Sequence, residues 1–88
     1  MAWTIEYTQT ARKQLKNLDK PLAVRILDFM DDRIGKQDDP RILAKALTGP
    51  LGALWRYRVG DYRVICEIQD SSTRILVLQI GHRREVYR

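Results

Sequence analysis

The 88-residue sequence has little of what builds cross-linked, metal-binding or membrane-spanning proteins. Its single cysteine, Cys66, excludes an intrachain disulfide. Candidate metal ligands are limited to its single histidine, His82, to Cys66 and to scattered acids, so we expect neither a metal nor another cofactor. No apolar run is long enough to span a membrane and no signal peptide is visible, so we expect a cytoplasmic protein.

The chain is also too short for two cores, so we expect one domain over residues 1–88. Cys66 lies in the apolar run 64–68, and we interpret it as a buried core residue rather than a nucleophile. The net charge of +5 favours an acidic protein or a nucleic acid as partner.

Hydrophobic patterns predict the order of elements. Alternation over residues 3–7 predicts a strand, and Thr8 or Thr10 can cap a helix over residues 11–18. Asp19 and Pro21 start a second helix that Gly35 is placed to end. Residues 36–53 are predicted to form a connecting region that contains a short helical turn over residues 42–47.

The C-terminal part reads as strands over residues 54–59, 62–68 and 74–80, with Gly81 ending the last. Gly60 and Asp61 form a two-residue hairpin loop with glycine first, as a type II′ turn requires. The predicted class is α+β in the order β-α-α-β-β-β. A helical hairpin packs on one face of a small sheet whose last three strands form an antiparallel meander.

Lysine is missing from residues 55–88, which hold seven arginines. Arginine presents a planar fork of donors that fits phosphate oxygens, whereas lysine is a mobile point charge. If Gly60-Asp61 is the loop, Arg58 pairs with Arg63, and Arg56 lies on the same face. Such like charges destabilise a sheet, which favours an anion-binding face. The alternative is that these side chains extend into water or are neutralised by Glu67 or Glu85.

The last predicted strand returns His82, Arg83 and Arg84 to the Arg58–Arg63 end of the hairpin, with Tyr87 close behind. Arginines can stabilise the charge that develops when RNA is cleaved, but they are poor general bases at neutral pH. The base would be Tyr87 or His82, and we favour Tyr87.

These residues resemble the RelE/StbE branch of the RelE/ParE toxin superfamily, the toxins of type II toxin–antitoxin modules. The resemblance covers nearly the whole chain. It rests on the early helix and linker and, above all, on two runs taken together: Trp-Arg-Tyr-Arg-Val-Gly-Asp-Tyr-Arg-Val at residues 55–64 and Gly-His-Arg-Arg-Glu-Val-Tyr at residues 81–87.

The resemblance implies a RelE-like microbial RNase fold and metal-independent, ribosome-dependent cleavage of mRNA. It also implies a cognate RelB-like antitoxin, which would supply any sequence-specific DNA contact in place of this chain. By position, Arg56 and Arg58 match residues that stabilise the scissile phosphate, Arg63 and Arg83 match two further arginines, and Tyr87 matches the candidate base. His82 and Arg84 are expected to contact RNA.

The sequence departs from the family pattern in two ways, and two alternative functions remain open. Arg56 and Arg58 replace lysines that are common in the family, which shifts the role of base to Tyr87. The sequence stops at Arg88, without the C-terminal helix of many relatives. The alternatives are a gyrase-inhibiting toxin of the ParE type and a non-catalytic nucleic-acid-binding module.

Overall fold

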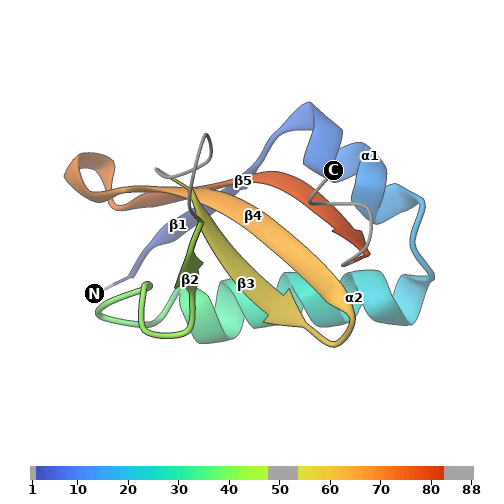
Figure 1. Ribbon diagram of the computed structural model, residues 1–88, viewed down its shortest axis with the longest axis horizontal. Helices are drawn as coiled ribbons and strands as arrows, with labels where there is room; N and C mark the ends of the chain where they lie inside the picture. The colour runs from blue at the N-terminus through green and yellow to red at the C-terminus, as the bar shows by residue number, and fades with distance from the viewer. Residues whose placement is uncertain (1, 48–53, 83–88) are drawn as a thin grey trace.

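A computed structural model describes residues 2–47 and 54–82 (Figure 1). It has a five-stranded mixed sheet in the order β1-β5-β4-β3-β2, with helices inserted after the first strand. The predicted α+β class is confirmed. The elements are β1 (Thr4–Tyr7), α1 (Gln9–Lys16), α2 (Lys20–Asp28), a π-helical segment η1 (Phe29–Ile34), β2 (Lys45–Ala46), β3 (Trp55–Val59), β4 (Tyr62–Gln69), a 3-10 turn η3 (Asp70–Ser72) and β5 (Arg74–His82).

The helices start where the sequence predicts. Thr8 is the N-cap of α1, and its side-chain oxygen accepts a hydrogen bond of 3.1 Å from the Ala11 amide. Asp19 precedes α2 and Pro21 lies in its first turn, although the Asp19 side chain makes no capping bond. Within the described ranges, no helix has the length and apolarity that crossing a membrane requires.

Gly35 ends the second helical segment for a reason of space rather than handedness. Its φ is −61°, an ordinary right-handed value, and its amide donates to the Met30 carbonyl at 2.8 Å. A Cβ atom at this position would lie 2.7 Å from the Asp31 carbonyl oxygen. The Gly35 carbonyl also accepts a 2.7 Å bond from the Trp3 amide, so the close approach ties the helix end to the N-terminal strand.

The β3–β4 hairpin has the predicted register. Val59 pairs with Tyr62 and Arg58 with Arg63. Gly60 has a φ of +59°, which glycine adopts without the steric cost that a Cβ brings and which the first position of a type II′ turn requires.

Three details differ from the prediction. The expected helical turn over residues 42–47 is wrong, because Lys45 and Ala46 pair with β3 as strand β2. The expected strand end at Gly81 is also wrong, since the ladder with β4 continues to the pair Tyr62–His82. The pairing of β1 with β5, which is parallel and joins the two ends of the chain, has no signal in the local sequence pattern.

The core lies between the helices and one face of the sheet. Figure 1 shows β3 and β4 in front of α2. Alternate residues of the central strands point to the helices, because successive side chains of a strand point to opposite faces. The buried apolar cluster consists of Ala11, Ile26, Met30 and Ile34 from the helical segments and Tyr57, Val59, Val64, Cys66, Ile75, Val77 and Ile80 from the strands.

Helix α1 covers the outer edge of β5 where β1 ends. The register of β1 with β5 stops at Tyr7 and Val77. Beyond it, the Thr8 hydroxyl donates to the Leu78 carbonyl at 3.1 Å, and the Gln14 side-chain oxygen accepts a 2.6 Å bond from the Ile80 amide. Side chains of one helix thus satisfy backbone groups that would otherwise form an open sheet edge.

Candidate functional site

Three arginines of the β3–β4 hairpin share the sheet face that is turned away from the helices. Arg58 lies directly opposite Arg63, and Arg56 lies opposite Ile65. The residues between them, Tyr57, Val59 and Val64, belong to the core cluster on the other face. The pairing that the sequence predicts for these arginines is therefore confirmed. Arg56, Arg58 and Arg63 are called the arginine face below.

The three side chains differ in exposure. Arg58 is exposed, Arg56 is half-buried, and Arg63 is only 4% exposed. Arg63 belongs to the central strand β4, between Arg58 on β3 and Gly81 on β5, and one of its guanidinium nitrogens donates to the Tyr62 carbonyl at 3.5 Å. Residues in directly opposite positions have Cβ atoms about 5 Å apart. The Arg58 and Arg63 side chains thus start close together on one face of the sheet.

This arrangement is suited to an anion. Within residues 2–47 and 54–82, Arg58 forms no ion pair. A phosphate bound at the exposed Arg58 would offset the repulsion between Arg58 and Arg63 and accept hydrogen bonds from the Arg58 guanidinium. Within these described ranges, no three histidine, cysteine or acidic side chains gather where they could hold a metal ion.

Lys45 extends the basic surface by one strand, and the sequence analysis missed it. It lies opposite Arg56 on β2 and is exposed. The helical turn expected over residues 42–47 hid this position, because the pairing of a two-residue strand depends on tertiary contacts. The one sequence signal for strand β2 is the alternation of apolar and charged residues over Ala44, Lys45 and Ala46.

His82 lies on the opposite side of the sheet from the arginine face. It pairs with Tyr62, whose ring packs against the core cluster. The two rings meet edge to face, with centroids 5.7 Å apart. His82 also borders an open cleft of about 340 Å³ with Gln14 and Asn17 of the α1 region. The sheet therefore stands between the imidazole and the arginine face.

The remaining predicted site residues, Arg83, Arg84 and Tyr87, lie outside the described residues. Their positions relative to the arginine face stay predictions. The last described residues of β5 do approach it, since Gly81 is the partner of Arg63.

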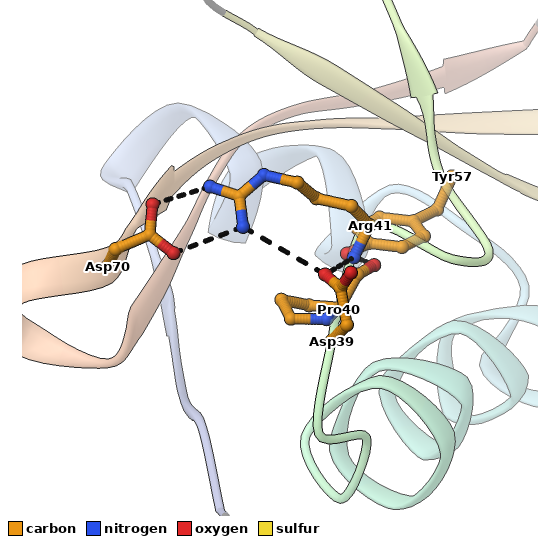
Figure 2. Close-up of polar contacts among 5 residues, drawn as sticks. All are labelled: Asp39, Pro40, Arg41, Tyr57 and Asp70. Atoms are coloured by element: carbon orange, nitrogen blue, oxygen red, sulfur yellow. Dashed lines mark hydrogen bonds and ion pairs between the residues drawn. The ribbon is translucent and has the colours of Figure 1, made fainter.

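A cluster around Arg41 fixes the segment that leads into β2 (Figure 2). The Arg41 guanidinium donates two hydrogen bonds to the Asp70 carboxylate, at 3.0 and 2.5 Å, and these bonds lower the pKa of Asp70. It also lies 5.5 Å from the centre of the Trp55 ring. The buried Tyr57 hydroxyl donates to the Pro40 carbonyl at 2.6 Å, and burial raises the pKa of that tyrosine. We call the Arg41–Asp70 ion pair the clasp.

A second open cleft, of about 440 Å³, lies beside the end of β3 and is lined by Arg58, Gly60 and residues of α2 and η1. Asp28 and Asp32 are among its walls, together with Arg25 and Arg33. The two carboxylates disfavour a phosphate there, so the arginine face is the better anion site.

Comparison with known proteins identifies the family to which this chain belongs. Residues 5–87 match the family described as ParE toxin of type II toxin-antitoxin system, parDE. The chain is 31% identical to Toxin RelE of Mycobacterium tuberculosis over 84 residues, which cover 96% of this chain and 84% of that protein. The chain belongs to the RelE/ParE superfamily of type II toxins. The resemblance inferred from the sequence is confirmed.

Two further relatives support membership in this superfamily. Toxin RelG of Mycobacterium tuberculosis is 28% identical over 88 residues, covering all of this chain and 99% of its own length. A chain in the crystal structure of the RelBE2 toxin–antitoxin complex from the same organism superposes with a TM-score of 0.87 at 26% identity, covering 97% of this chain and 95% of the other. This RelE/ParE toxin thus shares its fold with a solved RelBE system.

Proposed function

We propose that this RelE/ParE toxin is a metal-independent endoribonuclease that cleaves mRNA on the ribosome in the cytoplasm. The observation that carries the proposal is the arginine face, in which Arg58 lies directly opposite Arg63 and Arg56 shares their side of the sheet. Similarity to toxins named RelE and RelG supports it.

The reaction proposed is attack by the RNA 2′-oxygen on the adjacent phosphorus. The new O–P bond closes a 2′,3′-cyclic phosphate, and the bond to the 5′-oxygen breaks. Arg56, Arg58 and Arg63, with Arg83, stabilise the added negative charge of the phosphorane. A base removes the 2′-hydroxyl proton, and the leaving 5′-oxygen takes a proton from water.

Tyr87 is the proposed base, because guanidinium groups near a phenol lower its pKa. The position of His82 supports this choice, since its ring lies across the sheet from the arginine face. Arg84 is proposed to contact flanking RNA. His82 is proposed to contact RNA that passes around the end of β5 to the α1 side of the sheet.

The proposed protein partner is a RelB-like antitoxin, since the similar RelBE2 chain was solved in a toxin–antitoxin complex. An acidic segment that covers the arginine face would block phosphate binding by charge complementarity. Gyrase inhibition is the second candidate, because the matching family is described by its ParE members.

The test is induced expression followed by primer extension on cellular mRNA. We expect cuts within translated codons, lost in Arg83→Ala and Tyr87→Phe proteins that still fold. Loss of one charge-stabilising donor should slow cleavage by about 100- to 1,000-fold. Arg12→Ala is the matched control, because it removes one exposed arginine on α1. Intact mRNA together with gyrase-linked DNA breaks would refute the proposal and favour the second candidate.

A further inference from the structure

Lys45 occupies a defined position beside the arginine face. Its pairing with Arg56 places both side chains on one side of the sheet. Ala44 packs against the core cluster, which independently directs the next side chain away from the helices. The amide of Leu47 donates to the Leu54 carbonyl at 3.0 Å, so pairing between the two segments continues past β2.

The short strand β2 is held by contacts outside its own ladder. The clasp joins residue 41 to the β4–β5 turn, and the Arg41 guanidinium lies over the Trp55 ring. Pro40 is fixed by the buried Tyr57 hydroxyl, and the Asp39 carboxylate accepts a 3.0 Å bond from the Arg41 amide. Figure 2 shows Asp70 and Tyr57 reaching Arg41 and Pro40, just before β2. A two-residue strand alone would be marginal, so these anchors determine where Lys45 lies.

The basic side chains lie on three neighbouring strands rather than along a single strand. Arg63 lies on β4, Arg56 and Arg58 on β3, and Lys45 on β2. Neighbouring strands are about 4.8 Å apart, so Lys45 starts roughly 10 Å from the β4 backbone. Arg58 with Arg63 and Lys45 with Arg56 therefore form two opposed pairs of cations, two residues or about 7 Å apart along β3. Two such pairs suit two phosphates of one strand.

We propose that Lys45 binds a second backbone phosphate of the RNA strand and that the clasp positions it. The inference rests on the proposed function, in that the polyanion is RNA. A lysine ammonium supplies charge without the planar fork of arginine, which suits a contact that holds the strand without reading its sequence. Lys45 is thus a binding residue, and Arg41 and Asp70 are positioning residues.

The test measures binding of a 2′-O-methyl RNA oligonucleotide, which lacks the attacking hydroxyl and cannot be cleaved. Affinity is followed by fluorescence anisotropy over a range of salt concentrations. Each phosphate contact on a single strand contributes about −0.7 to the slope of log affinity against log salt. We expect Lys45→Ala to weaken binding and to reduce the steepness by about that amount, and Lys45→Arg to restore both.

Lys36→Ala is the control, because it also removes one exposed lysine, here one that lies 3.9 Å from Asp32. It should change affinity less than Lys45→Ala and leave the slope nearly unchanged. Equal losses in the two variants, or no measurable binding by the wild-type protein at low salt, would overturn the proposal.

Replacing Asp70 distinguishes the positioning role of the clasp from the effect of the protein's net charge on RNA binding. Asp70→Ala makes the protein more positive, so a purely electrostatic effect would tighten binding. We expect weaker binding, because loss of the clasp frees the segment before β2. Asp19→Ala, which removes an acid whose side chain makes no capping bond, should not weaken binding. Tighter binding by Asp70→Ala would refute the positioning role.

The oligonucleotide assay and the cleavage assay can fail separately. Wild-type protein that binds the oligonucleotide through Lys45 but leaves mRNA intact would contradict the proposed nuclease alone. Cleavage that persists with no effect of Lys45→Ala on binding would contradict the Lys45 proposal alone.

Discussion

Replacing Arg58 by threonine should make the toxin more stable while it disables the proposed RNA site. Arg58 and Arg63 face each other across two strands, where like charges destabilise a sheet. Threonine is favoured in strands and leaves Arg63 without a like-charged partner in that position. The expectation is therefore a gain in folding stability from the loss of a functional residue.

The size of the gain follows from exposure. Cross-strand pairs contribute about 0.2–1 kcal/mol, and repulsion between like charges is of similar size. Because Arg58 is exposed, water screens its charge, and we take about 0.5 kcal/mol as the expected increase in the free energy of unfolding. For a chain of this length, that corresponds to a rise of about 2–4 °C in Tm.

The assay is thermal unfolding at low salt and again at 1 M salt. The Debye length falls to about 3 Å at 1 M, so the repulsive part of the gain should largely vanish there. Arg74→Thr is the control on the same face. It removes the same charge but breaks a 3.1 Å ion pair with Glu6 and a 2.7 Å bond to Gln69, so it should lower Tm.

An Arg58→Thr protein that is less stable than wild type at low salt would refute the repulsion argument. So would a gain that persists unchanged at 1 M salt, because that would reflect the strand propensity of threonine rather than relief of charge repulsion.

Two further changes test the frame around the site. Gly35→Ala should lower the free energy of unfolding by about 1–3 kcal/mol, because the alanine Cβ would lie 2.7 Å from the Asp31 carbonyl oxygen. Chemical denaturation measures this change. An unchanged free energy of unfolding would show that η1 shifts easily to make room. Arg41 lowers the pKa of Asp70 below its ordinary 3.8, so the clasp stabilises the fold above that pH and loses its contribution as pH falls through the lower folded-state pKa. Acid titration of Arg41→Gln should therefore give a shallower loss of stability below pH 3.8 than wild type, whereas parallel curves would contradict the assignment.

Local signals predicted most of the fold and the central pair of the site. The Gly60-Asp61 loop sets the register of its hairpin, and register alone places Arg58 opposite Arg63. Thr8 and Pro21 mark helix starts by chemistry that acts within one turn. Each of these features depends on residues close together in the chain.

The parts that local patterns missed depend on distant partners. Strand β2 exists because β3 offers a ladder and the clasp anchors the preceding residues, so Lys45 could not be placed from its neighbours. The side of the sheet on which His82 lies follows from its pairing with Tyr62, which extends β5 beyond the glycine expected to end it. The positions of Arg83, Arg84 and Tyr87 stay predictions.

The parallel pairing of β1 with β5 has a consequence for biosynthesis. The first strand of the chain hydrogen-bonds to the last, and β5 is also the neighbour of β4, which carries Arg63. A nascent chain lacking β5 therefore cannot complete the sheet, and contacts so distant in sequence form slowly. The folded toxin should appear only after the whole protein has left the ribosome that made it. A partner already present in the cell then has the interval between translation and folding in which to bind.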